Sequence, residues 1–498
     1  QSNSNEPSME EDGDGGEDGE EQEMQVTQSS NSGGSNTSAN IQGGEESGEI
    51  EAQTDEMFTD SLKELSNPTS EQTYYVELPK VNLKHFIIDN QKIHDDMIAE
   101  WTDEQNNATK DYIARNPDYK TKPTEEICFN QYPYDPFNLF VHSDAEFNKF
   151  KKDAQKEVNY LVKEFECKKS AAAYARATTS RTGILDTAVL HTYKFNEDLF
   201  KKVSVVPDGK NHGLIFILDW SGSMSNVMMD TIKQLFNLVW FCKKVNIPFE
   251  VYAFTNSYPN PNRFDIVQED LKMHMDGNFA LLNLLTSKTR AKDMNEQMRN
   301  VFRLAFAFDH RGAYYRIPLG MSLSGTPLNE ALICLHQILP QFRKENGLQK
   351  VQCVVLTDGE AQSMRFNREL QRDWEENTYM GSAYLNDSCY IRNRKTGYVY
   401  GLKNMGYYGD ATDVFLEDLR QSFPETNFIG IRLMPNGWAS SFIQKYTDDP
   451  CEYDKSLNHW RKHKSISLKT SGYHVYFGLS STSLGNDTEF EVQEDATK

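Results

Sequence analysis

This sequence of 498 residues lacks the cysteine pattern of a secreted or zinc-binding protein. Its seven cysteines are scattered and none forms a Cys-x-x-Cys pair, which argues against a disulfide framework and against a zinc site. No run approaches the roughly 18 consecutive apolar residues that span a bilayer, and no basic-then-apolar leader opens the chain. We therefore expect a cytoplasmic protein without a membrane partner.

Common catalytic motifs are absent as well. The sequence has no Gly-x-x-x-x-Gly-Lys-Ser/Thr loop to cradle nucleotide phosphates, no His-Glu-x-x-His and no Gly-x-Ser-x-Gly. Any ATPase activity would belong to another protein. The sequence leaves open whether this chain is a subunit of an enzyme.

A surplus of basic residues, which would favour nucleic-acid binding, is also missing. The formal net charge is −22, and residues 1–60 contain 17 Asp and Glu without one Lys or Arg. Such a chain repels phosphate backbones, so nucleic acid is an unlikely partner. Residues 1–70 also have little apolar surface to bury, which predicts a disordered acidic segment, either a solvated linker or a docking tail for a basic partner.

The composition becomes globular after residue 70, and residues 71–205 are expected to form a helix-rich region. A short strand is predicted at Tyr74–Leu78. The clearest helix has apolar residues at spacings of three and four from Phe147 to Phe165, with Lys and Glu on its other face. Residues 481–498 are expected to be a flexible tail.

Apolar runs alternate with amphipathic segments from residue 206 to 480. This order predicts an α/β fold with a doubly wound, mostly parallel sheet. The predicted strands are Leu214–Leu218, Phe249–Phe254, Val351–Thr357, Phe428–Leu433 and Tyr473–Leu479. The predicted helices are 225–245, 294–308, 327–345 and 411–423.

Polar residues follow the most apolar predicted strand, at the sheet edge where ligands bind in such folds. Asp219-Trp220-Ser221-Gly222-Ser223 supplies one carboxylate and two hydroxyls. Thr326 precedes a predicted helix, and Asp358 ends a predicted strand. Oxygen ligands of these types suit a hard cation such as Mg²⁺.

Thr326 and Asp358 also have simpler interpretations. Thr326 is placed as the N-cap of a helix with Pro327 at the first helical position, and capping alone is one explanation of it. Asp358 in Asp-Gly taken singly is an ordinary turn carboxylate. Together with the Asp-x-Ser-x-Ser loop, however, the positions predict a metal site of Asp219, Ser221, Ser223, Thr326 and Asp358.

These motifs resemble the von Willebrand factor type A (vWA) domain and its metal-ion-dependent adhesion site (MIDAS). The resemblance implies that Ser221, Ser223 and Thr326 bind Mg²⁺ or Mn²⁺ through hydroxyls, and that Asp219 and Asp358 bind directly or through water. It also implies an open coordination position that a partner's carboxylate fills.

A closer likeness over about residues 180–480 is to the CobT-type subunit of cobaltochelatase, a family with relatives in large tailed phages. Thr182-Gly183-Ile184-Leu185-Asp186, a lysine-bearing strand and the metal motif carry it. It implies a metal-dependent interaction subunit that works with a MoxR-type AAA+ ATPase or a client protein, in a possible ring oligomer. The alternatives are a bona fide cobaltochelatase subunit of cobalamin biosynthesis and a structural adhesion-type vWA protein.

Two segments depart from a minimal vWA domain and are expected to be insertions, near 257–320 and 360–410. The second is rich in Tyr and predicts a hairpin over 390–400 with its turn at 395–397, and stacking on nucleobases is a minor alternative for it. Basic residues cluster between Arg290 and Arg316 in the first. They are either a docking patch or arginine finger for a neighbouring ATPase, or ordinary solvated charges of a helix and loop.

Overall fold

The computed structural model describes residues 73–480 except for short gaps. The gaps are 118–126, 130–131, 177, 186–193, 195–199, 206–210, 260–267, 310–312, 358–360, 372–376, 403–410, 435, 448 and 470–471. Our expectations for residues 1–70 and 481–498 lie outside the described residues. None of the described helices is both long and apolar enough to cross a membrane.

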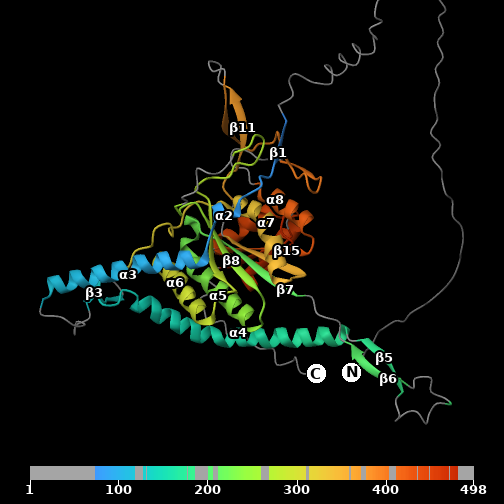
Figure 1. The fold of residues 1–498 in the computed structure, drawn as a ribbon, viewed down its shortest axis with the longest axis horizontal. Coiled ribbons are helices and arrows are strands. Elements are labelled where there is room, and N and C mark those ends of the chain that lie inside the picture. The colour runs from blue at the N-terminus through green and yellow to red at the C-terminus, as the bar shows by residue number, and fades with distance from the viewer. Residues whose placement is uncertain are drawn as a thin grey trace, which may run out of the picture. The chain divides into compact units, whose positions relative to one another are not determined.

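An eight-stranded sheet forms the centre of the unit that begins at Glu71 (Figure 1). Its order is β16-β17-β15-β10-β7-β8-β9-β2, and β17, β15, β10, β7 and β8 run parallel. The strands are β2 (Ile87–Ile88), β7 (His212–Asp219), β8 (Phe249–Thr255), β9 (Ala280–Thr286), β10 (Lys350–Thr357), β15 (Thr426–Met434), β16 (Ser465–Leu468) and β17 (Val475–Ser480). The predicted α/β fold with a mostly parallel sheet is confirmed.

Successive residues of the central strands face two different helical layers. In β7, Ile215 and Ile217 pack into one apolar cluster, whereas Phe216 and Leu218 pack into the other. Alternation of side chains across a strand explains why a continuous apolar run is needed when both faces are covered. The four predicted helices of this region are present as α5 (Met228–Lys244), α6 (Ala291–Asp309), α7 (Leu328–Asn346) and α8 (Thr412–Ser422).

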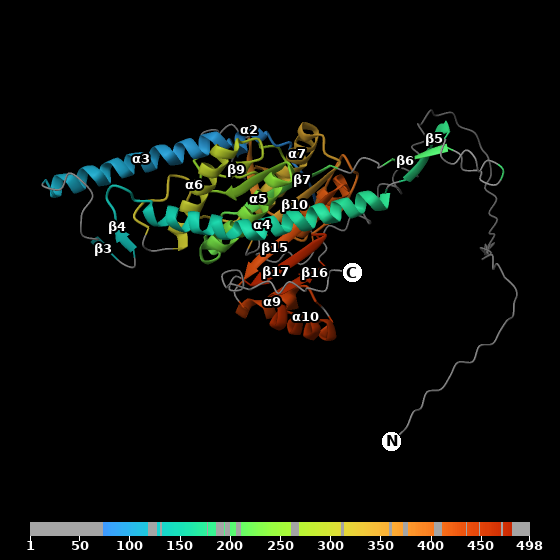
Figure 2. The same cartoon turned by 90° about the horizontal axis from the view of Figure 1, so that it is seen from below.

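Helices α5 and α6 cover one face, and α7 and α8 cover the other (Figures 1 and 2). Helix α4 (Val141–Arg176) contains the predicted Phe147 stripe and lies against α5 and α6. The Phe147 ring centroid is 6.3 Å from that of Phe236 on α5 and 5.4 Å from that of Phe302 on α6. The stripe is therefore a helix-packing surface.

Helix α3 (Asn90–Arg115) follows the edge strand β2 and is fixed to β9 by buried polar contacts. The Asn90 side-chain amide donates to the carbonyl of Leu284 at 2.8 Å, and the His94 Nε2 atom lies 2.8 Å from the same oxygen. Strand β9 was not among the predicted strands. It runs antiparallel to β8 and extends the sheet within the predicted 257–320 insertion.

The predicted hairpin of the second insertion is confirmed. Strands β13 (Cys389–Arg392) and β14 (Val399–Gly401) pair antiparallel, and Gly397 in the turn has φ of 79°, which favours glycine. Strand β1 (Tyr74–Glu77) pairs with β13 in parallel, so residues far apart in sequence form one small sheet. The predicted 360–410 insertion also contains the antiparallel pair β11 (Arg365–Gln371) and β12 (Thr378–Tyr384).

The remaining described elements are short, apart from one helix near the C-terminus. They are α2 (Leu83–Phe86), β3 (Ile127–Phe129), β4 (Tyr132–Tyr134), β5 (Thr178–Leu185), β6 (Phe200–Val205), η2 (Gly222–Asn226), η3 (Asn436–Trp438), α9 (Ala439–Lys445) and α10 (Pro450–His463). The antiparallel pair β5 and β6 includes Thr182-Gly183-Ile184-Leu185, part of the motif quoted above.

Candidate metal centre

The described residues of the predicted site, Asp219, Ser221, Ser223 and Thr326, cluster around the point where the strand order of the sheet reverses. From β7 the chain continues outward through β8 to β9, and then returns to place β10 on the other side of β7. Loops that leave β7 and β10 therefore diverge at their carboxyl ends, which is where open α/β sheets bind ligands. Asp219 is the last residue of β7, and Thr357 is the last residue of β10.

Asp219 is fully buried, and its carboxylate is oriented by β10. The Thr357 hydroxyl donates to Asp219 Oδ2 at 2.6 Å. Two residues beyond Asp219, Ser221 is almost fully buried, whereas Ser223 at the start of η2 is exposed. Their hydroxyl oxygens are 3.0 Å apart, so the two side chains point to a common place.

The loop that carries Thr326 lies directly beside this one. Ser221 and Ser324 form an isolated parallel bridge, in which the Gly222 N–H donates to the Ser324 carbonyl at 2.8 Å and the Ser324 N–H donates to the Trp220 carbonyl at 3.2 Å. The structure thus brings the first two motifs together, although they are about a hundred residues apart in the sequence. Asp358 lies outside the described residues.

The prediction that Thr326 is a helix N-cap is wrong. Helix α7 begins at Leu328, its N-cap is Pro327, and no side chain caps it. The Leu328 N–H donates to the Thr326 carbonyl at 2.9 Å, and Pro327 has φ of −79° and ψ of 53°, close to an inverse γ-turn. This turn moves Thr326 out of the capping position, so its hydroxyl is not used to cap the helix.

Side chains of neighbouring loops hold the Thr326 loop in place. The buried Trp220 indole donates to the Met321 carbonyl at 2.8 Å, and the Ser257 hydroxyl donates to the Ser322 carbonyl at 2.8 Å. The Gly325 N–H donates to Asn256 Oδ1 at 2.9 Å. Because Asn256 and Ser257 follow β8, three loops from the same sheet edge support one another.

A buried carboxyl group lies in the first turn of α7. Glu330 is 4% exposed and accepts a hydrogen bond of 3.1 Å from the Gln362 side-chain amide. Burial raises the pKa of Glu330 to about 7. Gln362 also donates its backbone N–H to the Thr326 carbonyl at 3.0 Å. Gln362 therefore connects the loop after β10 with both Thr326 and α7.

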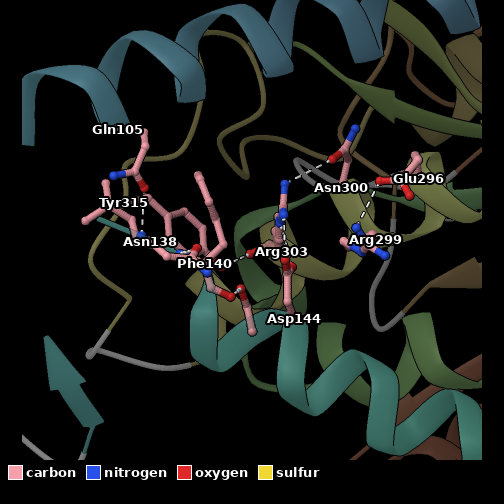
Figure 3. A network of polar contacts seen from close by, with 11 residues as sticks. Gln105, Asn138, Phe140, Asp144, Glu296, Arg299, Asn300, Arg303 and Tyr315 are labelled. Atoms are coloured by element: carbon pink, nitrogen blue, oxygen red, sulfur yellow. Dashed lines mark hydrogen bonds and ion pairs between the residues drawn. The ribbon is translucent and has the colours of Figure 1, made fainter. Parts of the chain in front are cut away.

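The described members of the basic cluster between residues 290 and 316 differ in their surroundings, and Arg311 lies outside the described residues. Arg303 on α6 donates to both carboxylate oxygens of Asp144 on α4, at 2.8 and 2.7 Å, and lies over the Phe140 ring at 4.2 Å (Figure 3). Arg299 pairs with Glu296 of its own helix. Arg316 has 94% of its side chain exposed and lies 3.9 Å from a carboxylate oxygen of Glu104.

The described donor set suits Mg²⁺ or Mn²⁺ better than a softer metal. Asp219 offers a carboxylate, and Ser221, Ser223 and Thr326 offer hydroxyls, so every candidate ligand atom is oxygen. Within the described ranges, no group of three or more His, Cys, Asp or Glu side chains is arranged so that it could hold a metal ion. A site made from those residue types alone, such as a zinc site, is therefore not found in that part of the chain.

Four residues that support the site were missed in the sequence. The sequence could have indicated Thr357, because it is a polar residue at the end of an apolar strand next to Asp358. Asn256 had the same kind of signal after β8. Gln362 and Glu330 had none, because their roles depend on contacts between segments that are distant in the sequence.

No protein-family model matches the chain, and no curated protein matches it. Similarity is found among solved structures. The chain is similar to the vWF domain of a pilus tip protein. This domain, from Mfa5 of Porphyromonas gingivalis, is 9% identical, with 56% of this chain and 92% of that chain covered and a TM-score of 0.25.

Two further similarities are of the same size. The pilus adhesin SpaC from Lactobacillus rhamnosus GG in its open conformation is 14% identical, with 51% of this chain covered and a TM-score of 0.26. The match spans 30% of the SpaC chain. Proximal thread matrix protein 1 from the mussel byssus is 11% identical, with 52% and 50% of the two chains covered and a TM-score of 0.21.

Proposed function

We propose that this chain is a metal-dependent protein-interaction subunit with a vWA-type MIDAS. Asp219, Ser221, Ser223, Thr326 and Asp358 would hold Mg²⁺ or Mn²⁺, and the ion would accept a carboxylate from a partner protein. The observation that carries the proposal is the bridge between Ser221 and Ser324, which joins the two hydroxyl-bearing loops at the carboxyl edge of the sheet.

Charge explains why such a site would capture an acidic residue. Three of the five proposed ligands are neutral hydroxyls, and where one of the two carboxylates binds through water, the charge of the ion is only partly offset by direct ligands. A bound divalent ion supplies the remaining positive charge and an open coordination position. The protein's part is to orient the ligands: Thr357 fixes the Asp219 carboxylate, and the bridged loops fix the hydroxyls.

Exposed side chains at the same edge supply further contacts for a partner. Leu319, 72% exposed, lies in the loop that leads to Thr326, and Trp438, 61% exposed, follows the carboxyl end of β15. Large exposed apolar side chains beside polar groups are typical of protein-binding surfaces.

The partner that we propose is a MoxR-type AAA+ ATPase, or a client that such a ring remodels. This chain would then be the non-ATPase component of a chelatase or remodelling complex, as the CobT resemblance implies. A cobaltochelatase subunit and an adhesion-type protein are the other candidate functions. All three would use the same contact between ion and carboxylate, so the identity of the partner separates them.

Binding to a purified MoxR-type ATPase tests the proposal. Pull-down should be strong with Mg²⁺ and should be lost with EDTA, and Ser221→Ala and Thr326→Ala should weaken it at a fixed Mg²⁺ concentration. Ser467→Ala, which removes an exposed hydroxyl from the edge strand β16, is the matched control and should bind like the wild type. Circular dichroism confirms that each variant is folded. Equal binding with and without divalent cation would refute metal-dependent capture.

A further inference from the structure

The position of the Thr326 hydroxyl must be fixed by contacts other than a helix cap. A hydroxyl that serves as a metal ligand has to be held within a few tenths of an ångström of its place. Because α7 begins only at Leu328 and no side chain caps it, the Thr326 hydroxyl is not held by a helix cap. The Thr326 carbonyl instead accepts two backbone hydrogen bonds, from Leu328 at 2.9 Å and from Gln362 at 3.0 Å. The second of these bonds comes from the loop after β10.

Gln362 is in turn fixed by its side chain. Its amide Nε2 donates to Glu330 Oε1 at 3.1 Å, so one residue is bonded to the Thr326 loop through its backbone and to α7 through its side chain. Gln362 also lies four residues after Asp358. It therefore ties the Thr326 loop to α7 and to the described segment that follows β10.

Glu330 is an unusual residue for its position. It is 4% exposed, and its second oxygen, Oε2, has no hydrogen-bond partner in the described part of the chain. Burying a carboxyl group with incomplete hydrogen bonding costs stability, and an apolar residue would pack there without that cost. The hydrogen bond from Gln362 Nε2 to Glu330 Oε1 requires a polar acceptor at this position.

Gly325 shows how closely the Thr326 loop is confined. A Cβ atom at Gly325 would lie 2.8 Å from Asn256 Nδ2 on one side and 3.0 Å from Gln362 Oε1 on the other. Both distances are shorter than ordinary van der Waals contacts, so the loop is clamped between side chains that follow β8 and β10. The clamp acts on the residue immediately before Thr326.

We propose that Gln362 and Glu330 are positioning residues of the metal site, and that the hydrogen bond between them sets the affinity for the ion by holding Thr326 in place between Gln362 and α7. The proposal rests on the metal site of the proposed function. Residues that hold metal ligands through hydrogen bonds orient those ligands, and removal of such residues typically weakens metal binding by about 10- to 100-fold.

Calorimetric titration of the full chain with Mn²⁺ alone tests the proposal. Gln362→Met keeps the length of the side chain but removes the donor, and we expect Mn²⁺ binding to weaken by about tenfold or more. The exchange Gln362→Glu with Glu330→Gln reverses donor and acceptor and keeps the net charge, and it should restore the wild-type affinity. Gln341→Met is the matched control, because Gln341 makes the same type of bond to Glu345 on the exposed face of α7.

The outcomes separate this proposal from the metal site itself. Loss of Mn²⁺ binding in Asp219→Ala together with normal binding in Gln362→Met would overturn the positioning role and leave the site intact. Normal binding in Asp219→Ala would overturn the site. Failure of the exchange variant to recover affinity, although folded by circular dichroism, would show that the pair does not act through this hydrogen bond. If Gln362→Met does not fold, Gln362→Ala, which keeps the backbone bond to Thr326, replaces it with the same expectation.

Discussion

The Thr357 hydroxyl donates a hydrogen bond of 2.6 Å to Asp219 Oδ2, and so joins the ends of β10 and β7 at the reversal of strand order. Both residues are buried, so water competes little for this bond. A carboxylate held in this way does not have to be ordered when an ion arrives. The bond therefore preorganises the acidic ligand of the candidate site.

Asp219→Ala should abolish Mg²⁺ and Mn²⁺ binding, because the remaining hydroxyls cannot neutralise the ion. Thr357→Val, which removes only the orienting hydroxyl, should weaken binding by about tenfold. Calorimetry with each cation measures both effects. Asp293→Ala, which removes an exposed carboxylate from the first turn of α6, is the control, and an equal effect of Asp219→Ala and Asp293→Ala would remove the basis of the site.

Thr326→Ala should weaken metal binding without lowering the stability of α7. Its hydroxyl does not cap α7, so we expect the free energy of unfolding without metal to change by less than about 0.5 kcal/mol. Asp89→Ala provides the comparison, because Asp89 is a true N-cap whose carboxylate accepts from the Gln91 N–H at 2.9 Å. That change should cost about 1 kcal/mol and leave Mn²⁺ affinity unaltered. Urea unfolding measures the stability of both variants, and calorimetry measures their Mn²⁺ affinity. A larger loss of stability in Thr326→Ala than in Asp89→Ala would contradict this prediction.

The sequence was sufficient for the central fold because local patterns determine it. The short apolar run Leu214–Leu218 is followed by polar residues and a long amphipathic segment, which favours a strand covered on both faces, and its end at Asp219 places the metal loop at the correct edge. Strand β9 was missed because its short apolar run, Ala280–Thr286, has no periodicity that separates a buried strand from a buried helix.

The errors at the site have a different cause. Thr326 followed by Pro327 has the sequence of a helix N-terminus, yet the backbone bonds of Thr326 to Leu328 and Gln362 produce a turn there. The inward position of Glu330 and its bond to Gln362 are likewise tertiary contacts. Local propensity cannot report contacts between segments that meet only in the folded chain.

Arg303→Met should destabilise the protein, because it breaks the contact that holds α6 against α4. The bidentate bond to Asp144 and the Phe140 ring place Arg303 in a half-buried setting, with 16% of its side chain exposed, and its loss leaves Asp144 unpaired there (Figure 3). We expect a loss of about 2 kcal/mol in the free energy of unfolding. Arg316→Met, whose side chain is 94% exposed, should change it by less than about 0.5 kcal/mol. Similar values from urea unfolding of the two variants would show that Arg303 is not structural.

His94 should make the folded protein sensitive to acid. Burial lowers the pKa of His94 to about 4 from an ordinary value of 6.5, because the imidazolium form would lose its hydration between α3 and β9. Below pH 6.5 the unfolded chain takes up a proton at this residue while the folded chain does not. The contribution of His94 to stability is therefore complete above pH 6.5, and it is lost as the pH falls toward 4, by up to about 3 kcal/mol.

The comparison that isolates this effect is between wild type and His94→Gln, since the glutamine amide can still donate to the Leu284 carbonyl but does not titrate. Acidic side chains elsewhere titrate in both proteins and cancel in the difference between their free energies of unfolding. That difference, measured by urea unfolding at pH 7.5, 6, 5 and 4, should shift in favour of the variant as the pH falls, with most of the shift below pH 6.5. Two parallel stability curves would mean that His94 binds its proton equally well in the folded and unfolded chains. The close contact of α3 with β9 would then not exclude water from the imidazole.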